Sequence, residues 1–225
     1  MGEAVGQSLA TAVAVAISPF PIIAVVLMLA TPQGRLNGPT FLLGWLLGLA
    51  VLGTIVLLLA EPANPSGSGG PATWVSWLKI VLGLLLLVVA VRQFRARPAS
   101  DDEAALPAWM GRIDRVKPPA ALGLGAFFAA INPKNFLLVV AGATAIAQTG
   151  IPAGQQAVAY AVFAIIGSVG VAVPLVIYVG MGERAPKTLA RLKDWLGLHN
   201  AVITSVLCTV IAAKLIGDAL TALTA

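Results

Sequence analysis

Charged residues are scarce in this sequence. Only 10% of its 225 residues are Asp, Glu, Lys or Arg, whereas 59% are hydrophobic and the mean hydropathy is +0.94. A soluble domain carries about 25% charged residues, and one core of this size cannot hide so much apolar surface from water. The composition therefore excludes a soluble enzyme, a secreted disulfide scaffold and a disordered tail, and it predicts a membrane protein.

Cysteine and histidine occur once each, as Cys208 and His199. One cysteine cannot form an internal disulfide, and one histidine cannot form a metal-binding cluster. The sequence also has no recognisable carboxylate pair, Ser/His/Asp set or Walker-type glycine loop. These absences predict that the protein is not an enzyme, does not bind ATP and needs no metal or other cofactor.

Six mostly apolar runs are each long enough to cross a bilayer, which takes about 20 residues. Together they predict an all-α integral membrane protein with one transmembrane domain over residues 1–225 and no separate soluble domain. The predicted spans are 4–30, 38–60, 73–94, 119–147, 153–182 and 199–222.

Basic residues are distributed very unevenly among the loops between these spans. The first, third and fifth loops contain all of the loop Lys and Arg, and the opposite side contains none. These residues are Arg35, Arg92, Arg95, Arg97, Arg112, Arg115, Lys117, Arg184, Lys187, Arg191 and Lys193. Because basic loops face the cytoplasm, we expect a plasma-membrane protein with both termini outside and these three loops inside. The net charge of +5 is then explained by basic residues on the cytoplasmic face of the membrane, and it does not indicate a nucleic-acid partner.

The loops also differ in composition. Residues 61–72 are rich in Gly, Ser and Pro and predict a flexible outer loop. The basic loop 95–118 and the basic segment 183–198 contain apolar residues at helical spacing, within 107–117 and 186–198. We expect amphipathic helices that lie on anionic inner-leaflet lipids. The alternative is ordinary loop structure whose charges only fix the topology.

Spans one and four each contain proline near the middle, in Ser18-Pro19-Phe20-Pro21 and Asn132-Pro133-Lys134-Asn135. Pro19 and Pro133 occupy nearly the same position within their spans. Because three spans separate them, the two halves of the chain run through the bilayer in opposite directions. The pattern predicts a 3+3 inverted repeat whose first and fourth helices are broken near the midplane.

Each break favours an anion-binding site. Ser18 or Asn132 as N-cap, followed by proline, begins a second half-helix whose N-terminus carries a positive partial charge. Lys134 adds a full charge, at an insertion cost of about 2.5–3.5 kcal/mol. The alternative is that both prolines only kink packed helices. The predicted substrate-binding residues are Ser18, Pro19, Pro21, Asn132, Pro133, Lys134 and Asn135.

Three more charged residues lie inside predicted spans: Lys79, Lys214 and Asp218. Lys79 is near enough to the outer surface for its side chain to snorkel, and Lys214 and Asp218 are spaced for an i, i+4 ion pair. All three are also candidates for the transport path, and with Lys134 they are the candidates for proton coupling. Small residues at Gly44 and Gly48 favour close helix packing within the chain, and they are also compatible with a homodimer.

The whole chain resembles the lysine-exporter (LysE) superfamily of small transporters. Within it, the chain is most similar to the glycolipid-addressing branch, the GAP or Sap family (glycopeptidolipid- and sulfolipid-addressing proteins) of mycobacteria and relatives. The composition, rich in Ala, Leu, Val and Gly, also suits an actinobacterium. The resemblance is carried by Ser18-Pro19-Phe20-Pro21, by Gly38-Pro39 with Phe41-Leu-Leu-Gly-Trp45, and by Ala130-Ile-Asn-Pro-Lys-Asn135.

This resemblance implies a flippase-like exporter that moves a lipid or glycolipid from the inner leaflet toward the outer leaflet or cell envelope, beside larger lipid-export machinery. Elsewhere in the superfamily, members export amino acids, so an exporter of amino acids or small metabolites is the first alternative. The second is a non-transporting scaffold of a lipid-export or synthesis complex, docked through its basic loops. The resemblance names neither the lipid nor the energy source.

Overall fold

The computed structural model describes residues 1–60, 73–96 and 116–224, and every regular element within them is a helix. The predicted outer loop 61–72 and most of the basic loop 95–118, with its expected amphipathic helix, lie outside the described residues. The elements are α1 (Gly2–Ala16), α2 (Pro19–Leu29), α3 (Gly34–Ala60), α4 (Thr73–Arg95), α5 (Pro118–Ala130), α6 (Pro133–Ala147), α7 (Ala153–Gly180), the short 3₁₀ helix η4 (Gly182–Arg184) and α8 (Ala185–Thr224).

These helices give four membrane spans, or six if each of two bent pairs is counted as one span. Four are long and apolar enough to cross a membrane alone: α3, α4, α7 and the stretch of η4 and α8. The other two are bent pairs, α1 with α2 at 48° and α5 with α6 at 61°. Each bend falls at the predicted proline, since Pro19 and Pro133 are the first residues of α2 and α6. The all-helical membrane fold with two broken spans is therefore confirmed.

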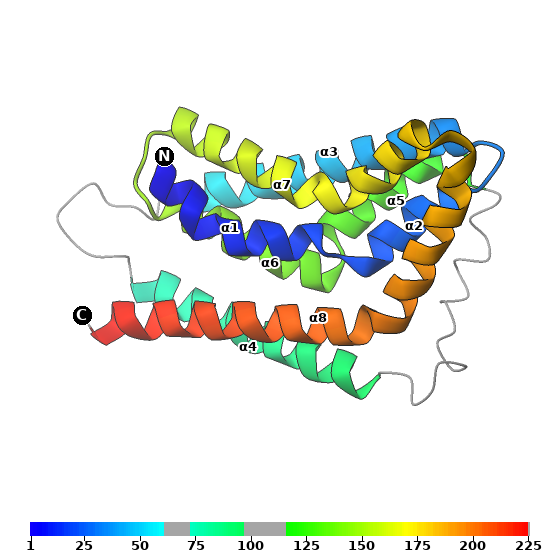
Figure 1. Cartoon of the computed structure of the whole chain (residues 1–225). Helices are drawn as coiled ribbons and strands as arrows, with labels where there is room; N and C mark the ends of the chain where they lie inside the picture. The colour runs from blue at the N-terminus through cyan, green and yellow to red at the C-terminus, as the bar shows by residue number, and fades with distance from the viewer. Residues whose placement is uncertain (61–72, 97–115, 225) are drawn as a thin grey trace.

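The helices lie in three rough layers (Figure 1). α3 packs along α5, with α7 beside them, on one side of the molecule. α1, α2 and α6 form the middle layer, and α4 lies along α8 on the other side. Both chain termini lie at the same end of the bundle, as six spans require. This arrangement places both helix breaks at the middle layer, between the layer of α3, α5 and α7 and the layer of α4 and α8.

Glycines bring the two halves into matching contacts. A side chain at Gly44 of α3 would overlap the backbone of Leu122 in α5, and one at Gly170 of α7 would overlap the carbonyl of Ala16 in α1. The second span thus packs on the fourth as the fifth packs on the first, which is the pattern that a 3+3 inverted repeat produces. Gly44 and Gly48 are both used inside the chain, so their face is not free for a homodimer.

The segment 186–198 is helical, but it is not the separate short helix that we expected. It forms the first part of α8, which has 40 residues and would measure about 60 Å if straight. No proline follows Pro186, so nothing in the sequence ends the helix before the last span. Figure 1 shows α8 crossing the end of the bundle opposite the termini and then turning to run along α4.

The first part of α8, over residues 186–198, has one face buried against the bundle and one face exposed. Leu189 and Leu196 are buried, whereas Trp195 is 53% exposed and stacks on His199. Lys187 and Arg191 are exposed on the other side of the helix. The apolar face therefore serves mainly to fix the helix to the bundle. Trp195 is the part of it that remains free to enter the membrane interface, where tryptophan is enriched.

Candidate functional site

The first helix break is held by a serine. Pro19 has no N–H for the carbonyl of Val15, four residues earlier, and its ring would clash with that carbonyl. The Ser18 hydroxyl lies 2.7 Å from the same Val15 oxygen and 2.8 Å from Oδ1 of Asn135, and its single proton serves one of them at a time. Ser18 occupies the predicted N-cap position of α2, but its side chain makes no cap hydrogen bond.

The second break is held by two asparagines. Asn132 caps α6 as predicted, because its Oδ1 accepts the N–H of Lys134 at 3.2 Å. Asn135 is fully buried, and its Nδ2 donates to the carbonyl of Phe128 near the end of α5 at 2.9 Å. Through Ser18, Asn135 also contacts the first break. The polar residues beside the prolines thus tie the two breaks to each other.

Lys134 lies where the breaks meet. Its side chain is 6% exposed, and its Nζ donates to the carbonyls of Ala14 and Ile17, each at 3.0 Å. These carbonyls stand at the C-terminal end of α1, where the helix dipole is negative. A lysine this deep in a span needs an acidic partner or a polar cavity. The structure gives it backbone carbonyls on one side and a cavity on the other.

All seven predicted binding residues line one cavity of about 230 Å³. Phe20 of α2 also lines it, and four further residues from α4 and α8 complete its wall. They are Val89, Arg92, Gln93 and Thr204. The cavity therefore lies between the middle layer and the α4–α8 layer, with both helix breaks on one side.

Arg92 is the residue of this cavity that sequence reasoning missed. Its position near the end of α4 made it one of several basic residues expected only to fix the topology. No local motif separates it from Arg95, which does not line the cavity, because its role depends on how α4 packs. Among the residues that the structure describes, the cavity wall includes Arg92 and Lys134 and no Asp or Glu, so the cavity suits an anion.

The half-helix N-termini contribute less than predicted. Pro19 and Pro21 have no N–H, so Phe20 carries the sole backbone donor among the first three residues of α2. In α6, the N–H of Lys134 is already bonded to Asn132. The positive character of the cavity therefore comes mainly from side chains, although the partial charge of both helix ends adds to it.

The other intramembrane charges lie outside this cavity. Lys214 Nζ and Asp218 Oδ2 are 2.6 Å apart on α8, and both side chains are partly exposed. Lys79 of α4 is near enough to interact electrostatically with both. None of the three lines the cavity, and the close pairing agrees with an ion pair that neutralises itself. Within the described ranges, no group of three or more His, Cys, Asp or Glu could hold a metal ion.

Comparison with known proteins identifies the family. A family model described as "Sap, sulfolipid-1-addressing protein" matches residues 9–221, which is nearly the whole chain. No curated protein and no solved structure shows significant similarity to the chain. The match includes both helix breaks and all residues that line the cavity. The chain belongs to the sulfolipid-1-addressing (Sap) family of membrane proteins.

Proposed function

We propose that this protein exports an amphipathic lipid or glycolipid whose anionic head group enters the cavity between the two helix breaks. The observation that carries the proposal is that Lys134 and Arg92 both line this cavity, whose described lining residues include no carboxylate. Sulfolipids, after which the family is named, carry such an anionic group. Asn132 and Gln93 add neutral hydrogen-bonding groups of the kind that bind sugar hydroxyls, while Asn135 holds the two breaks together.

The size of the cavity limits what can enter. Pockets that enclose a whole drug-sized ligand measure about 300–1,000 Å³, whereas this one measures about 230 Å³. It has room for a charged group and part of a head group, but not for acyl chains. The chains would stay in the membrane beside the protein, as expected of a flippase-like carrier. Rocking of the two repeats against each other would then move the head group across.

An amino-acid exporter fits the same cavity less well. A free amino acid carries an ammonium as well as a carboxylate, and the ammonium needs an acidic or carbonyl partner. The carbonyls nearest to Lys134 are already bonded to its own ammonium. A cavity whose described wall holds two cations and no carboxylate therefore favours an anionic head group over a zwitterion.

Replacing Arg92 tests the head-group site. We expect R92Q to weaken binding of a sulfated glycolipid by roughly tenfold to a hundredfold, because a hydrogen bond to a charged group contributes about 1.5–3 kcal/mol. R95Q is the matched control, since Arg95 lies one turn away and outside the cavity. The measurement is the affinity of purified protein for a fluorescent sulfated glycolipid, compared with its affinity for the same glycolipid without the sulfate. Equal losses in R92Q and R95Q would mean that both arginines act only as surface charge.

The direction of transport rests on the orientation of the chain, which we propose from its basic residues. Arg92 and Gln93 lie near the end of α4 that the charge pattern assigns to the cytoplasm. The cavity wall therefore includes the cytoplasmic half of α4, and head groups from the inner leaflet would enter there. A scaffold without transport activity would not need such access.

Cysteine labelling tests this orientation. In whole cells we expect a membrane-impermeant maleimide to label G154C but not Q33C, which should react only after the cells are opened. Both positions are exposed; Gln33 lies in the first connection between spans, and Gly154 lies in the first turn of α7, next to the fourth. The native Cys208 is buried and does not interfere. The reverse labelling pattern would place the termini in the cytoplasm and turn the proposed direction around.

A further inference from the structure

A second cavity lies on the opposite side of the molecule from the head-group cavity. It is a groove of about 520 Å³ between α3 and the first half of α7. None of the residues that line it is charged. They are Leu46, Ala50, Thr54, Leu57, Leu58, Ala153, Gln156, Ala157, Tyr160, Ala161, Ala164 and Ile165. Small alanines form much of the α7 side, so this face of α7 leaves space that no other described helix fills.

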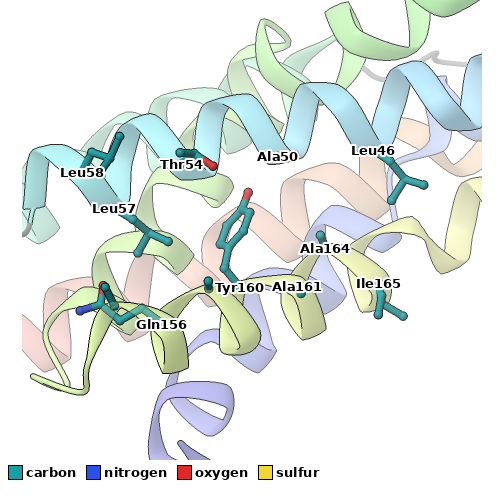
Figure 2. A pocket seen from close by; sticks show the side chains of 12 residues that line it. Leu46, Ala50, Thr54, Leu57, Leu58, Gln156, Tyr160, Ala161, Ala164 and Ile165 are labelled. Atoms are coloured by element: carbon teal, nitrogen blue, oxygen red, sulfur yellow. The ribbon is translucent and has the colours of Figure 1, made fainter.

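Tyr160 holds the two sides of the groove at a fixed distance. Figure 2 shows its ring pointing from α7 toward α3, near Thr54. Its hydroxyl donates to the carbonyl of Leu49 at 2.6 Å, and its ring lies so close to Gly53 that no side chain would fit there. The tyrosine is buried, so it forms the floor of the groove and not an obstacle within it.

Two of the three polar side chains that line the groove are already hydrogen-bonded within the protein. The Tyr160 hydroxyl is bonded to α3, and Nε2 of Gln156 donates to the carbonyl of Ile151 at 2.9 Å. By contrast, the cavity at the other end of the same two helices includes Arg35 and Glu183. Of these two cavities between α3 and α7, the groove between Leu46 and Leu58 is therefore the one without charged residues in its lining.

The length of the groove matches one leaflet. From Leu46 to Leu58, α3 rises by about 18 Å, and α7 rises by the same amount from Ala153 to Ile165. Half of the hydrocarbon core of a bilayer is about 15 Å thick. The groove lies in the half of the bundle nearer the chain termini, because it is formed by the last part of α3 and the first part of α7.

We propose that this groove binds one acyl chain of a lipid in the leaflet on the side of the termini, which is the outer leaflet in the proposed orientation. The hydrocarbon of that leaflet surrounds this part of α3 and α7. A chain lying between the helices gains contacts on three sides, whereas a chain on a convex helix surface gains them on one. The groove is separate from the head-group cavity, because the middle layer of helices lies between them.

Photolabelling tests the proposal. The protein is placed in vesicles containing phosphatidylglycerol with a diazirine in the middle of one acyl chain, and the labelled peptides are found by mass spectrometry after illumination. We expect the label to concentrate on the lining residues of α3 and α7. A161W should fill the groove and reduce that labelling at least fivefold. V158W is the matched control, since Val158 is exposed on the same helix but outside the groove.

Ala161 is exposed, so tryptophan there extends into space and does not disturb the core. A157F provides a second way to fill the groove if A161W fails to fold. Uniform label over all membrane-facing helices, or equal effects of A161W and V158W, would overturn the proposal. So would a covalent dimer formed through A161C, because the occupant would then be a second copy of the chain. Labelling does not depend on export, so failure of the transport proposal leaves this test intact.

Discussion

Removing the charge of Lys134 is expected to abolish export. In K134Q, the amide can still donate to the carbonyl of Ala14 or Ile17, so the two breaks stay joined while the charge in the cavity is lost. Lys134 and the anionic head group would form a buried charge pair. Removing one charge of such a pair costs about 2–5 kcal/mol, which corresponds to at least a roughly thirtyfold loss of head-group binding. Appearance of a sulfated glycolipid in the outer leaflet of vesicles measures the effect.

Two further lysine variants separate binding from folding. K134M removes the charge and both hydrogen bonds, and an unpaired buried carbonyl costs about 1–3 kcal/mol. We therefore expect K134M to lose thermal stability in detergent as well as export, whereas K134Q loses mainly export. K79M replaces another lysine within a span, one that lies outside the cavity, and it should export at the normal rate.

The results for these variants distinguish a transport site at Lys134 from one at Lys79, Lys214 and Asp218. Normal export by K134Q would contradict a head-group site at the helix breaks. Loss of export in K79M would instead indicate a path between α4 and α8, where Lys79 lies near Lys214 and Asp218. Loss of export in both Lys134 variants, together with reduced levels of both proteins, would indicate that Lys134 only stabilises the break.

The breaks themselves were predictable from sequence, because the effect of a proline is local and covalent. Pro19 and Pro133 remove a backbone donor wherever the helix lies, so the position of each bend follows from the chain alone. The same holds for Asn132, whose capping role depends on its immediate neighbours. These local rules were enough to identify seven of the residues that line the cavity.

The partners of the breaks were not predictable, because they come from other parts of the chain. Nothing near Arg92 in the sequence indicates that this residue lines the cavity at the breaks while Arg95 does not. The acceptors of Lys134 are backbone carbonyls of α1, and a backbone carbonyl has no signature in a sequence. The continuous α8 was missed for a related reason, since a charged amphipathic segment does not reveal whether the next span continues the same helix.

Replacing Gly44 by alanine is expected to have the largest effect on stability. The new methyl group would overlap the carbonyl of Leu122, because α3 and α5 touch backbone to backbone at this point. Overpacking a core usually costs about 1–3 kcal/mol, and a backbone atom cannot rotate away as a side chain does. For a chain of this size, a cost of about 3 kcal/mol lowers the melting temperature by roughly 6–12 °C.

The same substitution at Gly123 is the control, and at Gly170 it tests the repeat. Gly123 lies in α5 with nothing close to its missing side chain, so G123A should be neutral or slightly stabilising, because alanine favours the helix. Gly170 meets the carbonyl of Ala16 as Gly44 meets that of Leu122, so G170A should lower the melting temperature about as much as G44A. If G44A matched G123A instead, the second and fourth spans would not be in close contact. If G44A were destabilising and G170A neutral, the packing would not repeat between the halves, and rocking of equivalent halves would lose its structural basis.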